Sequence, residues 1–162
     1  EIEMGTPMKK VLNDIGGGFK EPIKALQIGG PLGGVIPIAE AEKLNLDFQE
    51  FTAAGFMLGH ASIVSIPKDF PMVEYIHHLF EFTAEESCGK CFPGRLGSYR
   101  GKEMFDQLKS KTAKIPLKVL NDLLLTMKNG CLCALCGAIP TPIMNILKYF
   151  GDEMKDDMVK EN

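Results

Sequence analysis

The sequence has no apolar run of the roughly 20 residues that a membrane-spanning helix requires, because Lys, Glu, Asp or Asn soon interrupts each hydrophobic stretch. It also has no excess of basic charge, since 18 Lys and Arg stand against 21 Asp and Glu, for a formal charge of −3. A surface that binds nucleic acid needs clustered positive charge. We therefore expect no membrane span and no nucleic-acid partner.

Cysteine is absent from the first 87 residues, and all five cysteines lie between positions 88 and 136. The start of the chain has neither the basic residues nor the apolar run of a secretory signal. It also lacks an initiator Met, so the chain looks like a piece of a longer protein. Odd, clustered cysteines without a leader argue against a disulfide framework and favour metal binding in a reducing compartment. The expected location is the cytoplasm, free or peripheral to a membrane complex.

The first 68 residues carry the signals of a small α+β domain. Strands are predicted over 1–4, 23–28 and 62–66, and short helices over 6–15, 38–43 and 47–54, with Thr6 as the N-cap of the first helix. The run GGPLGGVIP predicts tight turns. Because the opening strand has no hairpin partner before it, this domain is expected to be truncated at its N-terminus.

From Phe70 onward, apolar residues follow the spacing of helices. Pro or Gly bounds each predicted helix, over 70–85, 95–109, 116–128 and 142–156. Short connections favour an antiparallel bundle, with cysteines in the loops before its second and fourth helices. The predicted fold class is thus α+β, with a first domain over 1–68 and a four-helix bundle carrying a Cys metal site over 69–162.

The cysteines form two C-x2-C pairs, Cys88 with Cys91 and Cys133 with Cys136, and Cys131 lies close to the second pair. Two residues between ligands let a loop entering a helix direct both thiolates to one metal centre, in zinc and iron–sulfur sites alike. Zinc ribbons usually place their pairs about 15 to 20 residues apart, whereas a full helix and more separates these pairs. The spacing favours iron–sulfur, and zinc held by four thiolates stays open.

The charged residues near the first pair have two interpretations. Four basic residues lie within about a dozen residues of this pair, namely Lys90, Arg95, Arg100 and Lys102. Positive charge here would lower thiol pKa values and offset the charge of a thiolate-ligated cluster. The alternative is an ordinary solvated helix face.

The histidines His60, His77 and His78 are expected to lie away from the cysteines. His77 precedes Cys88 by about three helical turns, which places it at another level of the bundle. No Ser/His/Asp or Cys/His arrangement emerges, so we expect no catalytic residue.

Two motifs carry a family resemblance. The run ESCGKCFPGRLGSYRG resembles the E-S-C-G-x-C-x-P-C-R motif of the flavoprotein subunit of NADH dehydrogenase (respiratory complex I), and of its relatives in NAD-dependent formate dehydrogenase and bidirectional hydrogenase. NGCLCALCGAIPTPI resembles the second motif of those families, S-L-C-x-L. Upstream, EMGTPMKKVL, GGPLGG and DFQEFTAAGFMLGHASIVSI are similar to their soluble-ligand-binding β-grasp domain, so the resemblance implies a β-grasp-like fold for residues 1–68.

The resemblance implies a [4Fe-4S] cluster held by three cysteines of the first motif and one of the second. Cys88, Cys91 and Cys133 match those positions, but Gly94 stands where the third ligand of the first motif belongs. Cys136, at a position where relatives usually have glycine, is the candidate replacement, ahead of Cys131. The rival outcomes are a three-ligand or [3Fe-4S] site, a zinc site, or an empty site.

The resemblance also implies a function. It predicts the electron-transfer part of an NAD(P)H:acceptor oxidoreductase, passing electrons between FMN and the cluster. FMN and NAD(P) would bind in a preceding domain that this chain lacks, so it should be inactive alone. Its partners would be that domain and other iron–sulfur subunits of a dehydrogenase complex. Two other hypotheses stay open: a zinc-stabilised docking module without redox activity, and a small-molecule sensor in the first half.

Overall fold

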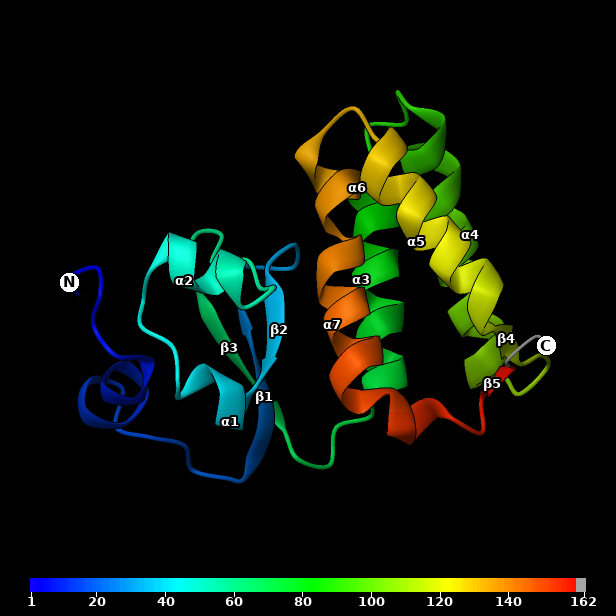
Figure 1. Ribbon diagram of the computed structural model, residues 1–162. Helices are drawn as coiled ribbons and strands as arrows, with labels where there is room; N and C mark the ends of the chain where they lie inside the picture. Colours follow the sequence, from blue (N-terminus) through cyan, green and yellow to red (C-terminus); the bar gives the residue numbers. More distant parts are fainter. Residues whose placement is uncertain (160–162) are drawn as a thin grey trace. The chain divides into compact units, whose positions relative to one another are not determined.

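The computed structural model describes residues 1–159, and the chain divides into two compact units, Glu1–Phe70 and Pro71–Asn162 (Figure 1). The first unit combines a small sheet with short helices, and the second is mainly helical. The predicted α+β class is confirmed.

The sheet of the first unit has three antiparallel strands in the order β2-β1-β3. Its central strand β1, Ile23–Ile28, is the one that the sequence pattern predicted, and β3, Ile63–Pro67, lies within a residue of its predicted position. The strand β2, Gly34–Pro37, was missed because glycine and proline at its two ends predicted turns. Val35 and Ile36 in its centre are fully buried, so core packing makes this segment a strand.

The turn after β1 requires glycine. Gly29 has φ of +92°, and a Cβ atom at this position would lie 2.4 Å from the carbonyl oxygen of Leu58. Any other residue would meet both a disfavoured left-handed conformation and a backbone collision. The segments around Gly29 and Leu58 therefore lie against each other main chain to main chain.

The start of the chain differs from the prediction. Residues 1–4 form no strand, and the amide of Gly5 instead bonds the carbonyl of Leu46 at 2.9 Å. Thr6 does not cap a helix, because its hydroxyl donates to the carbonyl of Glu3 at 2.7 Å. The helix that follows includes a π-helical segment, η1, over Lys10–Ile15.

Two further helices complete the first unit. They are α1, Ile38–Ala41, and α2, Phe48–Ala53. Asp47 caps α2, because its side chain accepts hydrogen bonds from the amides of Gln49 and Glu50. Phe51 of α2 is fully buried in the core of this unit.

The second unit contains four longer helices close to their predicted positions. These are α3, Met72–Glu86; α4, Phe92–Lys109; α5, Leu117–Gly130; and α7, Pro140–Phe150. A short helix α6, Ala134–Ala138, was not predicted, and α7 ends earlier than expected, followed by the 3-10 helix η2, Gly151–Met154. The short strands β4, Ile115–Pro116, and β5, Met158–Val159, pair in parallel. Helix α3 packs against α4 and α7, and α5 against α4, α6 and α7 (Figure 1).

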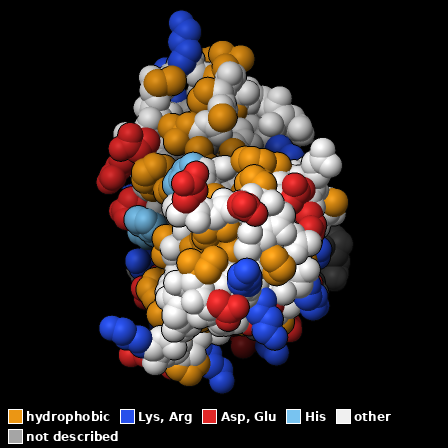
Figure 2. Space-filling view, turned by 90° about the vertical axis from the view of Figure 1, so that its left-hand side faces the viewer, with side chains coloured by type: hydrophobic (Ala, Val, Ile, Leu, Met, Phe, Trp, Pro, Cys, Tyr) orange, Lys and Arg blue, Asp and Glu red, His pale blue; other side chains and the backbone are white. Residues whose placement is uncertain are grey.

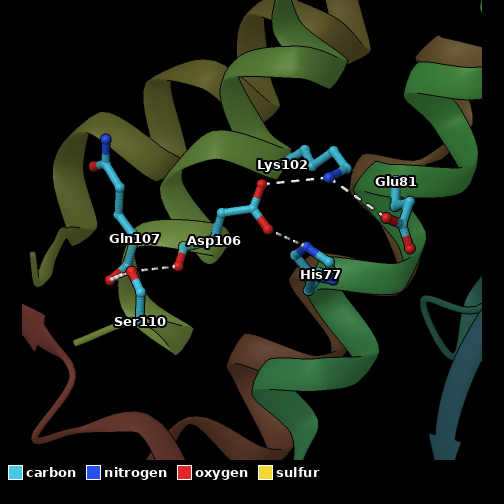
Figure 3. Close-up of polar contacts among 6 residues, drawn as sticks. All are labelled: His77, Glu81, Lys102, Asp106, Gln107 and Ser110. Carbon is cyan, nitrogen blue, oxygen red and sulfur yellow. Dashed lines mark hydrogen bonds and ion pairs between the residues drawn. The ribbon is translucent and has the colours of Figure 1, made fainter. Parts of the chain in front are cut away.

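A polar network ties α3 to α4 (Figure 3). His77, only 7% exposed, shares a hydrogen bond with Asp106 at 2.6 Å, and Lys102 lies 3.3 Å from Asp106 and 3.4 Å from Glu81. Burial would raise the pKa of the Asp106 carboxyl, but hydrogen bonds to His77 and Lys102 outweigh it and hold that pKa below its ordinary value. The same hydrogen bond to Asp106 raises the pKa of Lys102.

The surface mixes charges of both signs. On the face drawn in Figure 2, Lys and Arg side chains are interspersed with Asp and Glu, and hydrophobic side chains lie between them. Within residues 1–159, none of the helices combines the length and the apolar character needed to cross a membrane.

Candidate metal centre

The cysteine-bearing loops meet at one end of the helical unit. Cys88 lies in the loop after α3, and Cys91 is the residue directly before α4, which begins three residues earlier than predicted. Cys131 follows α5, Cys133 precedes α6, and Cys136 lies inside α6. The thiol of Cys136 reaches back to the first loop, donating to the Ser87 hydroxyl at 3.8 Å.

Gly94 lies close to two of the sulfur atoms. A Cβ atom built on Gly94 would lie 2.8 Å from Sγ of Cys136 and 3.1 Å from Sγ of Cys91. Both distances are shorter than ordinary van der Waals contact, so a side chain at position 94 would need the space that the Cys136 thiol fills. Cys136, which is 2% exposed, therefore presents its sulfur where a side chain of residue 94 would point.

The surroundings of Cys91 favour its thiolate. The backbone amides of Leu132 and Gly94 hydrogen-bond to the Cys91 sulfur and lower its pKa. Cys91 is also the N-cap of the 18-residue helix α4, where the helix dipole favours negative charge. Because the thiolate is the form that binds metals, a lowered pKa favours metal binding at this position.

The pKa values of Cys131 and Cys136 are shifted upward, opposite to the shift of Cys91. Burial, followed by the charges of Cys136 and Cys91, raises the pKa of Cys131 to about 12. Burial also raises the pKa of Cys136, and the neighbouring charges of Cys133 and Cys91 add to that effect. Thiolates crowded in this way need positive charge beside them, which a metal centre supplies when it deprotonates its ligands.

The donor set fits an iron–sulfur cluster. Among residues 1–159, no three His, Cys, Asp or Glu side chains are arranged round a point that one metal ion could occupy. The Sγ atoms of Cys91, from the first loop, and of Cys136, from the second, nevertheless lie together beside Gly94. All-thiolate sets suit iron–sulfur clusters and zinc. A [4Fe-4S] cluster binds each thiolate through a separate iron, so its ligands surround a larger body than one ion.

Comparison with known proteins identifies the family. Residues 74–157 match the family described as the NADH-ubiquinone oxidoreductase-F iron-sulfur binding region. This match covers more than half of the chain and includes both cysteine pairs. The chain belongs to this family. The resemblance found in the two cysteine motifs is thereby confirmed, and the helical unit is an iron–sulfur binding region.

Individual relatives support the same assignment. The chain is 33% identical over 156 residues to the NADP-reducing hydrogenase subunit HndC of Solidesulfovibrio fructosivorans, covering 94% of this chain and 32% of that protein. It is 29% identical over 159 residues to an NADH-quinone oxidoreductase subunit of Rickettsia bellii, covering 96% and 38%. The chain thus spans about a third of the length of the curated relatives it matches.

A solved structure supports the fold. The chain superimposes on a chain of an NAD+-reducing [NiFe]-hydrogenase in the H2-reduced state with a TM-score of 0.83. The sequence identity is 19%, and the match covers 99% of this chain and 27% of the hydrogenase chain. At this identity the likeness shows a shared fold and nothing further.

The basic residues that follow the first pair are engaged with other groups. Arg95 lies over the ring of Phe92 at 5.0 Å, and Arg100 pairs with Glu103 at 2.6 Å. Lys102 binds the carboxylates of the α3–α4 network. Arg100 and Lys102 therefore fit the solvated helix face better than a role in lowering thiol pKa values.

The three histidines have different surroundings. His77 binds Asp106, and His60 and His78 are exposed.

Cys131 lies beside the short helix of the second cysteine pair. Its Cβ atom lies 3.7 Å from where a Cβ of Gly137 would be, so Cys131 packs against α6. The spacing C-x-C-x2-C over Cys131, Cys133 and Cys136 was a visible signal, because it places three thiols within a single loop and turn. No pattern in the sequence indicated the contact between the Cys136 thiol and the Ser87 hydroxyl.

Proposed function

We propose that this chain is the electron-transfer part of an NAD(P)H:acceptor oxidoreductase flavoprotein subunit. In this proposal a [4Fe-4S] cluster, held by Cys88, Cys91, Cys133 and Cys136, exchanges electrons with FMN in a preceding domain. Membership of the iron–sulfur binding family supports the cluster. The names of the relatives, a NADP-reducing hydrogenase subunit and NADH-quinone oxidoreductase subunits, support the type of reaction.

The contact between Gly94 and Cys136 carries the proposed ligand set. The family motif calls for a thiol at position 94, and this chain has none there. Sγ of Cys136 lies 2.8 Å from where the Cβ of that residue would be, on the side shared with Cys91. Compared with the family motif, this chain has glycine at position 94 and a thiol at position 136. The sulfur of Cys136 lies close to the place that the sulfur of a cysteine at position 94 would take. Cys136 is therefore the replacement for the missing ligand.

The two parts of the chain have separate roles in this proposal. Residues 69–162 form a four-helix bundle whose loops present the thiolates. Residues 1–68 form a β-grasp-like domain that packs the flavin domain against the cluster domain. The partners are the preceding FMN and NADH domain and the other iron–sulfur subunits of a dehydrogenase complex. The proposed location is the cytoplasm, free or peripheral to a membrane complex.

The residues around the site hold and shield the cluster. The amides of Leu132 and Gly94 stabilise negative charge on Cys91. The buried Cys136 excludes water from one side, whereas Cys88 and Cys133 are exposed. Phe92 and Leu132, 68% and 78% exposed, make the rim apolar. When bound, the cluster would accept and release single electrons, and the exposed side gives those electrons a short path in and out.

The first test is the metal content of the chain expressed without oxygen. We expect about four iron and four sulfide per chain, no stoichiometric zinc, and a brown absorption band that dithionite bleaches. NADH added to the chain alone should leave both the nicotinamide absorbance and the cluster spectrum unchanged. One zinc per chain without colour would overturn the proposal in favour of a structural module.

A second test addresses the ligand exchange between positions 94 and 136. The variant Cys136→Gly should lose the cluster, and adding Gly94→Cys in the same chain should restore it. The matched control is Ser98→Cys combined with Cys136→Gly, which places a thiol one turn further along α4, at another fully buried position. Iron and sulfide content decides the result. If Cys136→Gly keeps all its iron, Cys136 is not a ligand.

A further inference from the structure

We propose that Ser87 is a positioning residue for the cluster, because its hydroxyl donates a hydrogen bond to the Cys136 sulfur when that sulfur binds iron. The bond holds the Cys136 ligand against the first cysteine loop and raises the reduction potential. This inference rests on the proposed function, since it concerns one ligand of the same cluster. It goes beyond the family resemblance, because relatives usually have glycine at position 136 and so have no sulfur there.

The contact between Ser87 and Cys136 joins the two cysteine loops. Ser87 is the residue directly after α3, where the first loop begins. Its hydroxyl oxygen lies 3.8 Å from Sγ of Cys136, which belongs to α6 and is 49 residues further along the chain. Ser87 is half-buried, and Cys136 is only 2% exposed. The contact is therefore largely shielded from water.

A second hydrogen bond orients the Ser87 hydroxyl. The amide of Gly89 donates to the Ser87 hydroxyl oxygen at 3.3 Å. Gly89 has φ of +71°, so this bond closes a tight turn around Cys88. A serine hydroxyl has one proton to donate and two lone pairs that accept. Because the Gly89 amide uses a lone pair, the hydroxyl proton stays available for another acceptor.

Metal binding fixes the direction of the contact. In the free thiol, Cys136 donates its proton and the Ser87 oxygen accepts it. A cysteine that binds a metal is deprotonated, so its sulfur can only accept. The Ser87 hydroxyl must then donate, with its oxygen and the Cys136 sulfur at the same positions. The bound ligand thus receives a hydrogen bond from a side chain that the Gly89 amide already orients.

This hydrogen bond should favour the reduced cluster. Hydrogen bonds to the sulfur atoms are among the factors that set the reduction potential of iron–sulfur clusters. Reduction adds one electron to the cluster, and the Ser87 proton stays on its oxygen while its bond to the more negative sulfur strengthens. Of the four proposed ligands, Cys136 is the buried one. Water is therefore poorly placed to replace the hydroxyl if Ser87 is removed.

The experiment compares the anaerobic wild-type chain with Ser87→Ala and Ser87→Thr in potentiometric titrations followed by electron paramagnetic resonance. We expect all three to keep about four iron per chain. At a fixed applied potential, Ser87→Ala should lower the ratio of reduced to oxidised cluster about fivefold, and Ser87→Thr should keep the wild-type ratio. The control is Ser98→Ala, which removes a hydroxyl that bonds the carbonyl of Gly94 at 2.7 Å and should leave the ratio unchanged.

A second measurement separates the hydrogen bond from the turn around Cys88. Electron–nuclear double resonance of the reduced cluster in H2O and in D2O detects exchangeable protons beside the sulfur atoms. Ser87→Ala should show one coupling fewer than the wild type, and Ser87→Thr should keep it. If the potential falls while the couplings stay the same, Ser87 acts through the turn and the inference is wrong.

The remaining outcomes distinguish this inference from the proposed function. A wild-type chain without a cluster overturns both. If the wild type binds a cluster and Ser87→Ala has the same potential, the inference is wrong and the proposed function stands. If Ser87→Ala binds no iron, Ser87→Thr is compared with Ser87→Val, which matches it in shape and lacks the hydroxyl. A lower potential in the valine variant alone supports the inference, and equal behaviour of the two contradicts it.

Discussion

The two units of this protein use glycine in opposite ways. In the first unit, Gly29 is needed for its left-handed backbone, and what lies against it is the main chain at Leu58. In the second unit, the glycines of α4 have ordinary helical backbone, and what fills the space above them is side chains. Gly94 faces Cys136, Gly97 faces Met127, and Gly101 faces Phe80.

This difference bears on how each unit can change. A side chain at position 29 would collide with the main chain at Leu58, and no substitution makes a main chain smaller. A second substitution therefore cannot compensate for the loss of Gly29. A side-chain collision can be relieved by shortening the neighbour. The row of glycines on α4 therefore allows paired exchanges, and the exchange proposed for Gly94 and Cys136 at the end of this row is one of them.

The largest effect is expected for Gly29→Ala in the first unit. Left-handed strain and the collision with the Leu58 carbonyl should together lower the free energy of unfolding by about 3 kcal/mol. Urea unfolding followed by far-ultraviolet circular dichroism measures this change, and hydrogen exchange over 23–28 localises it. Gly55→Ala is the control, because Gly55 has φ of +83° but nothing within 4 Å of its Cβ position, and it should cost about 1 kcal/mol. If the two variants lose the same free energy of unfolding, the collision with the Leu58 carbonyl does not contribute to the cost of Gly29→Ala.

An intermediate effect is expected for Gly101→Ala in the second unit. The new methyl group would overlap the ring of Phe80 and should cost about 2 kcal/mol by overpacking. In a Phe80→Leu background the same substitution should cost less than half as much. Tyrosine fluorescence during urea unfolding reports this unit alone, because Tyr75, Tyr99 and Tyr149 all lie in it. Additive losses would contradict the idea that side-chain collisions can be compensated.

The smallest effect is expected for Asp106→Ala, which removes the partner of buried His77. The loss should be about 1 kcal/mol at neutral pH, because His77 keeps its burial without its hydrogen bond. Since the folded state lowers the pKa of Asp106, its contribution is present above the ordinary carboxyl pKa and is lost as the pH falls through the folded value. The gap between variant and wild type should therefore begin to narrow below about pH 4 and close once the pH is below the folded pKa of Asp106.

A matched variant checks that prediction. Asp122→Ala removes an exposed pair with Lys118 on α5. It should change stability by less than about 0.5 kcal/mol. If both variants lose the same amount at neutral pH, the burial of His77 does not contribute.

The elements that the sequence predicted well are those with strong local periodicity. The central strand β1 and the helices α3, α4 and α5 each carry enough apolar residues to show their period. The missed elements are short or depend on distant partners. The helix α6 has five residues, too few to show a helical period. The strand predicted over 1–4 does not form, and the amide of Gly5 donates its hydrogen bond to the carbonyl of Leu46, which is distant in sequence and lies outside the strands.

The sequence by itself determined the α+β class, the two C-x2-C pairs and the family, because spacing along the chain encodes each of them. It also showed that a thiol is missing at Gly94. Only the tertiary structure decided that Cys136 fills the space beside Gly94 and that the sulfur of Cys91 lies on the same side of Gly94. Those neighbours lie on separate helices and loops, and their distances depend on how α4, α5 and α6 pack together, which no local pattern records.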